Sequence, residues 1–187
     1  MFNKEIKNPK NYILHSGGAN GADYQWEFVG REFGLTNFNH YWYYKPNPHS
    51  KPKDQISDSD YEEGCLMVQE VNKKYLRRKG IEKYMHLLAR NWAQVKYSDT
   101  IFAIGTLYGN MVNGGTAYAT FMGIIVEKPL YVYEQYKKQW YFWHEKSFEV
   151  CVTPVLVKDF AGIGTREIND DGIQAIRNVY EKTFGKV

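Results

Sequence analysis

The chain of 187 residues has little cysteine and no long apolar run. Its two cysteines, Cys65 and Cys151, lack the close spacing of metal or redox sites, so we expect buried, reduced thiols, as in a cytoplasmic protein. No stretch approaches the roughly 20 apolar residues that cross a bilayer, and the polar N-terminus does not resemble a signal peptide. These absences argue against a disulfide-stabilised secreted protein and predict no contact with a membrane.

Neither sign of charge dominates, and no pattern of metal ligands occurs. The 24 basic and 21 acidic residues leave a net charge of +3, which is too small to predict nucleic acid as a partner. The histidines do not have the spacing of metal ligands, so we expect no metal and no cofactor; they are His15, His40, His49, His86 and His144. Aromatic residues, by contrast, are abundant, and the length suits one domain, 1–187, with a substantial core.

The most informative stretch is residues 15–23, His-Ser-Gly-Gly-Ala-Asn-Gly-Ala-Asp. It follows a short apolar segment, 12–14, typical of a buried strand, and precedes an amphipathic stretch, 22–33, typical of a helix. Unpaired N–H groups at such a helix start favour an anion such as phosphate, and glycines let a ligand approach the backbone. The spacing is neither the dinucleotide fingerprint nor a Walker loop. The alternative is a tight turn in which Asp23 only stabilises the first helical turn.

Two further glycine turns have the same setting. Residues 113–116, Asn-Gly-Gly-Thr, follow an apolar strand at 100–105 and precede a helix at about 117–126. Residues 161–167 follow a strand at 155–160 and precede a helix at about 169–184. Alternating strands and helices predict a Rossmann-like three-layer α/β fold with a mostly parallel central sheet and the glycine loops at its C-terminal edge.

Between the first and second glycine turns, a strand at 38–43 is followed by a proline-rich surface loop at about 45–59 that serves as a lid or a partner contact. Ser57 or Ser59 then caps a long helix. Its basic end, at 73–79 before Gly80, is interpreted as a solvated helix terminus rather than a nucleic-acid patch.

A further helix is predicted at about 81–96, and Arg90, Asn91 and Gln94 share one edge of it. After the second glycine turn, 129–133 reads as a strand. The aromatic segment 139–144 is expected at the edge of the core or over a ligand.

Residues 16–23 resemble the Ser-Gly-Gly-Ala-x-Gly-Ala-Asp signature of the SLOG superfamily. This Rossmann-like group includes the DNA-processing protein A family and the LOG cytokinin-activating phosphoribohydrolases. The segment 88–105 and the turn 114–116 also resemble uncharacterised bacterial and phage members. The resemblance implies that the ligand is a nucleotide or an ADP-ribose-like derivative, and because SLOG-like domains often pair, it also implies a homodimer.

Residues 160–167, Phe-Ala-Gly-Ile-Gly-Thr-Arg-Glu, resemble an element that in related proteins starts the domain, one helix before the first signature. In this chain that element comes last. We infer a circular permutation in which the strand and helix at 155–184 replace the usual first unit. It predicts that the strands at 12–15 and 155–160 are parallel neighbours.

If the three loops converge, their backbone and neighbouring side chains surround one ligand. Asp23 accepts from ribose hydroxyls or a base amine in this hypothesis, and Arg166 pairs with either a phosphate or a nearby carboxylate. A Tyr or Trp from 38–44 or 140–143 stacks on the base. The full set of expected ligand-binding residues is Ser16, Gly17, Gly18, Ala19, Asn20, Asp23, Arg90, Asn91, Gln94, Gly105, Gly114, Gly115, Thr116, Gly162, Gly164, Thr165 and Arg166.

Two functions remain open. LOG enzymes carry Pro-Gly-Gly-x-Gly-Thr-x-x-Glu, whose Glu performs the chemistry, but no Glu follows Thr116 at that spacing. The missing Glu favours a non-catalytic protein that senses or sequesters a nucleotide-derived signal, conceivably a phage anti-defence protein in the host cytoplasm. The alternative is a nucleotide or N-glycosidic-bond hydrolase, for which only Asp23, Glu27 or Glu167 supplies a carboxylate near the loops.

Overall fold

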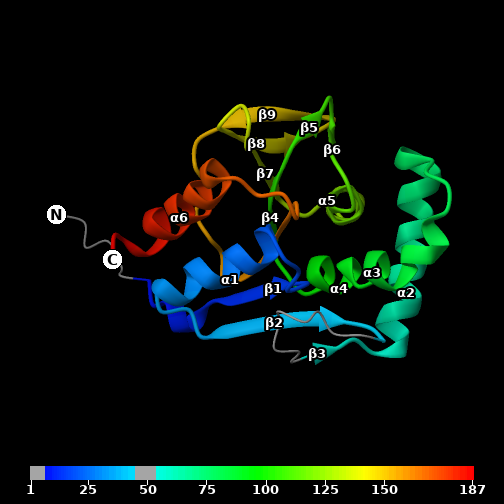
Figure 1. The fold of residues 1–187 in the computed structure, drawn as a ribbon, viewed down its shortest axis with the longest axis horizontal. Coiled ribbons are helices and arrows are strands. Elements are labelled where there is room, and N and C mark those ends of the chain that lie inside the picture. The colour runs from blue at the N-terminus through cyan, green and yellow to red at the C-terminus, as the bar shows by residue number, and fades with distance from the viewer. Residues whose placement is uncertain (1–6, 45–53) are drawn as a thin grey trace.

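The computed structural model describes residues 7–44 and 54–187, and its central feature is a sheet of eight strands (Figure 1). The strand order is β3-β2-β1-β10-β4-β7-β8-β9. Every pairing from β3 to β7 is parallel, whereas the pairings of β7 with β8 and of β8 with β9 are antiparallel. Helices cover both faces, so the protein has the expected Rossmann-like α/β fold. The strands of this sheet are β1 Ile13–Ser16, β2 Asn37–Trp42, β3 Asp54–Gln55, β4 Thr100–Gly105, β7 Leu130–Glu134, β8 Gln139–His144, β9 Ser147–Cys151 and β10 Asp159–Gly164.

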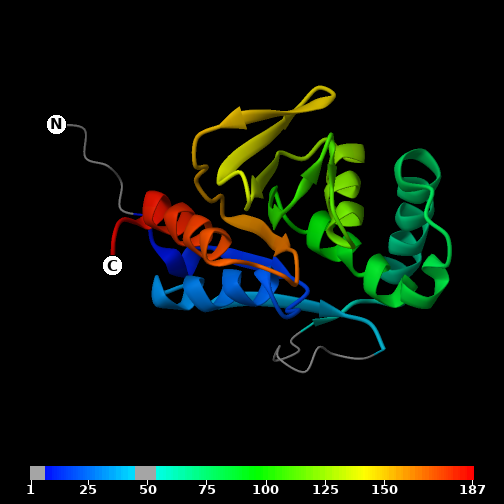
Figure 2. The same ribbon diagram turned by 45° about the horizontal axis from the view of Figure 1, so that its top comes forward.

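Two sets of helices form the outer layers. One face packs against α1 and α6, and the other packs against α4 and α5, while α2 lies to the side of the sheet and packs against α3, α4 and α5 (Figures 1 and 2). The alternation of side chains along β4 explains the division, because Phe102 and Ile104 point to the first face while Ile101 and Ala103 point to the second. The helices are α1 Ala22–Glu32, α2 Asp58–Val71, α3 Met85–Ala89, α4 Asn91–Lys96, α5 Thr116–Ile125 and α6 Asp170–Phe184.

Smaller elements complete the described chain. A 3₁₀ turn, η1, precedes the first strand, and a π-helix, η2, extends α2; a second 3₁₀ turn, η3, leads into α3. A short hairpin of β5 and β6 lies between β4 and α5, where the sequence indicated only a turn. Their bounds are η1 Pro9–Asn11, η2 Asn72–Leu76, η3 Ile81–Tyr84, β5 Leu107–Tyr108 and β6 Met111–Val112.

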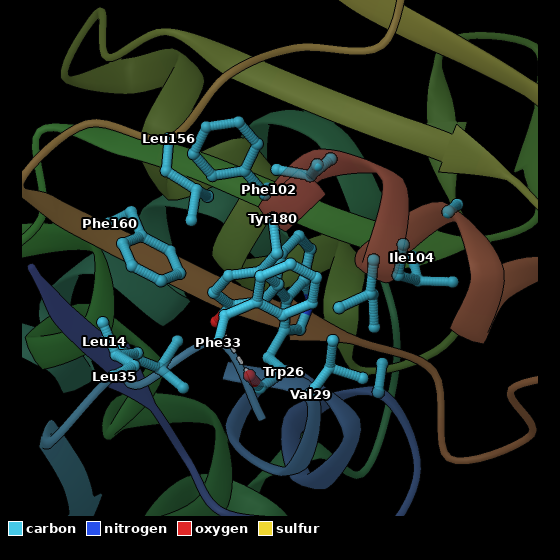
Figure 3. Packing of buried hydrophobic residues seen from close by; sticks show 14 of the residues in the cluster. Leu14, Trp26, Val29, Phe33, Leu35, Phe102, Ile104, Leu156, Phe160 and Tyr180 are labelled. Atoms are coloured by element: carbon cyan, nitrogen blue, oxygen red, sulfur yellow. Dashed lines mark hydrogen bonds between the residues drawn. The ribbon is translucent and has the colours of Figure 1, made fainter. Parts of the chain in front are cut away.

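The hydrophobic core between the sheet and helices α1 and α6, here called the first core, has Trp26 at its centre (Figure 3). It is fully buried, and its indole N–H donates to the carbonyl of Ile163 at 3.3 Å. The hydroxyl of Tyr180 donates to the carbonyl of Trp26 at 2.8 Å. These two bonds join α1 to β10 and to α6, so they fix the orientation of the Trp26 indole within its apolar surroundings.

The first and last strands of the chain are parallel neighbours, with Leu14 opposite Phe160, which confirms the predicted pairing. The last strand, however, spans 159–164 rather than 155–160. Gly162 therefore lies inside a strand and not in a turn. A Cβ at this position would lie 2.6 Å from both Leu14 and Trp26, so the glycine is required by packing.

Three expected elements have different bounds. Within the predicted loop at 45–59, residues 45–53 lie outside the described part, while β3 and the start of α2 occupy its end; Ser57 is the cap, and its Oγ accepts from the N–H of Asp60 at 3.1 Å. The predicted helix at 81–96 consists of η3, α3 and α4. The long basic helix ends before Gly80, because Arg77 adopts a left-handed conformation with φ of 52°.

The aromatic segment at 139–144 forms β8, between β7 and β9. Trp140 is buried in the first core, as the interpretation of this segment as core packing required. The strand β9 that follows was not predicted.

Candidate functional site

A cavity of about 610 Å³ lies beyond the C-terminal ends of β10, β4 and β7. The connection from β1 to β2 runs through α1 on one face of the sheet, whereas that from β4 to β7 runs through α5 on the other face. Crossovers that diverge in this way leave a crevice at the carboxyl ends of the strands, which is where open α/β sheets bind ligands.

Most of the predicted binding residues line this cavity. The third loop packs on the first, since the N–H of Ala22 donates to the carbonyl of Thr165 at 2.9 Å and a Cβ on Gly21 would lie 2.4 Å from the same oxygen. The second loop completes the wall. The predicted residues in the lining are Ala19, Asp23, Arg90, Asn91, Gln94, Gly114, Gly115, Thr116, Gly164, Thr165 and Arg166.

Asp23 organises the first loop from within. Its carboxylate accepts from the N–H of Gly164 at 3.2 Å, and the N–H groups of Ala19 and Gly17 favour its charged form. Burial raises the pKa of Asp23, although the charge of Arg90 and these hydrogen bonds oppose the rise. Backbone donors that the sequence assigned to a phosphate are therefore used by a carboxylate of the chain itself.

Other members of the first loop do not line the cavity. Ser16 is fully buried, and its Oγ accepts from the N–H of Gly18 at 3.3 Å. Gly17 lies behind the cavity wall, where a Cβ would be 2.9 Å from a guanidinium nitrogen of Arg90. Asn20 is exposed. The prediction that these four residues contact a ligand is not supported by their positions, because they build the turn that holds Asp23.

Two glycines from the later strands are also absent from the lining. Gly162 packs under Trp26, as described above. Gly105 ends β4 and faces the β5–β6 hairpin, where a Cβ would lie 2.9 Å from Val112. Its neighbour Thr106 lines the cavity instead.

Arg90 is the deepest cation of the site. The side chain is only 7% exposed, and its Nη1 donates to the carbonyl of Gly17 at 3.2 Å. Its Nε is buried without a hydrogen-bond partner in the described part of the chain. Burial lowers the pKa of Arg90, an effect that the charge of Asp23 opposes and that of Arg166 reinforces. A buried guanidinium with an unused donor beside a cavity is suited to an anionic or strongly polar ligand.

Several lining residues were not predicted. Arg78 and Lys79 belong to the basic end interpreted as a solvated terminus, yet both line the cavity. The aromatic lining is Tyr84, Tyr118 and Tyr136, and no residue of the expected segments 38–44 and 140–143 contributes to it. The run of basic residues immediately before Gly80 was the available signal for Arg78, but nothing in the sequence showed that α2 reaches α5.

The charges of the lining favour an anion. Arg78, Lys79, Arg90 and Arg166 contribute positive charge, against the carboxyl groups of Asp23 and Glu167. The third carboxylate considered at the sequence level, Glu27, does not line the cavity; it lies 2.8 Å from His40 Nε2 and pairs with Arg31.

Comparisons of the chain with protein-family models, with curated proteins and with solved structures find no match. Among residues 7–44 and 54–187, no group of three or more His, Cys, Asp or Glu side chains is arranged to hold a metal ion. Within the same residues, no helix has the length and apolar character that crossing a membrane requires.

Proposed function

We propose that this chain binds a nucleotide-derived small molecule, of the ADP-ribose or cyclic nucleotide type, in the cavity at the C-terminal edge of the sheet, and that it senses or sequesters this molecule without cleaving it. The observation that carries the proposal is the cationic cavity itself, in which buried Arg90 retains an unused donor. A volume of about 610 Å³ falls within the range of pockets that hold drug-sized ligands.

The resemblance of residues 16–23 to the SLOG signature supports the same class of ligand. It extends the proposal to a circularly permuted SLOG-like domain that acts in the cytoplasm as a homodimer. The ligand in this proposal is a host immune signal of the nucleotide type, which the protein acts against as a phage anti-defence protein. Tyr84 and Tyr136, both exposed aromatic residues of the lining, are suited to stack on a base.

Hydrolysis is the second candidate, because Asp23 lies in the cavity with a raised pKa, as a general acid requires. The N–H of Gly164 already donates to its carboxylate, however, and the N–H groups of Ala19 and Gly17 also lower its pKa, so Asp23 acts as a structural acceptor. Glu167 is exposed at the lining and has no comparable arrangement. Binding without cleavage therefore fits the geometry better.

The test uses Gly115→Trp. A Cβ at Gly115 meets no atom within 4 Å, and its φ of −67° suits any residue, so the backbone accepts a side chain here; because Gly115 lines the cavity, we expect the indole to occupy part of it. Ser59→Trp is the matched control, since it places the same side chain at an exposed position in the first turn of another helix, outside the cavity. Each purified protein is incubated with a panel of nucleotides, ADP-ribose and cyclic ADP-ribose, then denatured, and the released molecules are identified by mass spectrometry.

We expect an intact nucleotide to be released from the wild type and from Ser59→Trp, and at least about tenfold less from Gly115→Trp, which corresponds to about 1.4 kcal/mol of binding energy. Cleaved products that accumulate with time would replace the proposal with the hydrolase. Equal retention by Gly115→Trp, or no retention by the wild type, would refute binding in this cavity.

A further inference from the structure

The end of α2 is built in an unusual way that brings a cation to the cavity. The helix widens into the π-helix η2, and the N–H of Arg77, in its left-handed conformation, closes that turn by donating to the carbonyl of Asn72 at 2.7 Å. The next residue, Arg78, is then held by Asn72, whose amide donates to its carbonyl and accepts from its N–H, each at 2.9 Å. π-helical turns are rare and frequently occur at functional sites.

Arg78 connects this turn to the start of α5. Its Nη1 donates to the carbonyl of Gly114 at 2.8 Å, and its guanidinium carbon lies 5.6 Å from the ring centre of Tyr118. The Tyr118 hydroxyl in turn donates to Asn72 Oδ1 at 2.9 Å. Arg78, Gly114, Tyr118 and Asn72 thus form a closed set of contacts that fixes the second glycine loop against the basic end of α2.

The same contacts leave donors for a ligand. A guanidinium carries five N–H donors, and the bond to Gly114 uses one of them. At the start of α5 the N–H of Ala117 donates to the carbonyl of Gly114, and that of Tyr118 donates to the carbonyl of Gly115. The N–H groups of Gly115 and Thr116 have no hydrogen-bond acceptor within the described residues. These free donors and the helix dipole favour an anion there.

We propose that Arg78, together with Lys79 and the N–H groups of Gly115 and Thr116, forms the subsite that binds a phosphoryl group of the ligand. This rests on the function proposed above and specifies which part of the ligand lies where. The N–H of Gly18 donates to Ser16 and those of Gly17 and Ala19 favour the charged form of Asp23, so the phosphoryl group binds at the second loop instead. The buried Arg90, with its unused Nε in the same lining, points independently to a ligand in this cavity.

The experiment measures the binding of inorganic phosphate to the purified protein by ³¹P line broadening, with acetate at equal ionic strength as the comparison anion. The variants are Arg78→Gln and, as a matched control, Arg77→Gln. Arg77 is exposed and outside the lining, so its replacement removes the same charge one residue away while the left-handed backbone carries an equally long side chain.

We expect wild type and Arg77→Gln to bind phosphate with affinities within about twofold of each other, and Arg78→Gln to bind about tenfold more weakly, since charge-assisted bonds are the stronger ones. Arg78→Lys should lie between them, because it keeps the charge without the fork. No phosphate binding by the wild type, or equal losses in Arg77→Gln and Arg78→Gln, would overturn the subsite. If the subsite fails but a nucleotide is retained in the mass-spectrometric test, the proposed function still stands. If phosphate binds but no nucleotide is retained, the anion subsite stands and the proposed function fails.

Discussion

Gly162→Ala tests whether this glycine serves packing or a ligand. The added Cβ would lie 2.6 Å from Leu14 Cδ1, 2.6 Å from Trp26 Cγ and 2.9 Å from Trp26 Cβ. Leu14 and Trp26 are fully buried, and the indole is tied to Ile163, so neither side chain has room to withdraw. We therefore expect the full cost of overpacking, about 1–3 kcal/mol of the free energy of unfolding.

Urea denaturation followed by tryptophan fluorescence measures this cost. With a slope of about 2 kcal/mol per molar urea, a loss of 2 kcal/mol lowers the midpoint by about 1 M. Gly115→Ala is the control, because its Cβ meets nothing within 4 Å and its φ is ordinary. That variant should be as stable as the wild type or up to about 1 kcal/mol more stable. An unchanged midpoint for Gly162→Ala would refute the packing argument and return this glycine to the list of ligand contacts.

Two further predictions concern groups outside the cavity. Burial raises the pKa of Glu27, but hydrogen bonds from His40 and Arg31 lower it by more, so its charge stabilises the folded state. Glu27→Gln should cost about 1–2 kcal/mol at pH 7. Because a lowered carboxyl pKa contributes stability above the unfolded value of about 4.3, the difference should shrink as the pH falls below that value and disappear below the lowered pKa of the folded state; a difference that does not shrink on acidification would contradict this. Tyr180→Phe removes the hydroxyl bond to Trp26 and should cost about 1–2 kcal/mol in urea denaturation, against no change for the exposed Tyr24→Phe.

The sequence predicts the centre of the parallel sheet well, because β1, β4 and β10 each lead through glycines into a helix. It misplaces the last strand by four residues, since the glycines at 162 and 164 are typical of a turn. Only the packing shows why a strand contains them, because a Cβ at 162 would meet Trp26 and a Cβ at 164 would meet the carbonyl of Ile104. The short strands β3, β5 and β6 carry too few residues for any alternation to appear.

For the candidate site, local sequence chemistry identifies some residues of the cavity lining but misses those that reach it through contacts between distant segments. Asp23 and Arg166 flank glycine turns, and both line the cavity. Arg78 lies at the end of a helix, where the sequence alone predicts a solvated cation. Its place in the cavity lining depends on a contact with Gly114, which is distant in the sequence. The sequence predicts that the N–H of Gly18 binds a phosphate, yet in the structure this N–H donates to the hydroxyl of Ser16. A single sequence does not show which acceptor a backbone donor will find.

The position of β10 between β1 and β4 has a consequence for how the protein is made. β1 and β2 leave the ribosome early, and β4, β7, β8 and β9 follow, but the strand that joins the two groups is synthesised last. Without residues 159–164, β1 and β4 have no strand between them, so the sheet cannot be completed before β10 is available. We expect the cooperative fold of these strands to form only after residues 159–164 have been synthesised, by insertion of β10, and the long sequence separation of β10 from β1 to make that step slow.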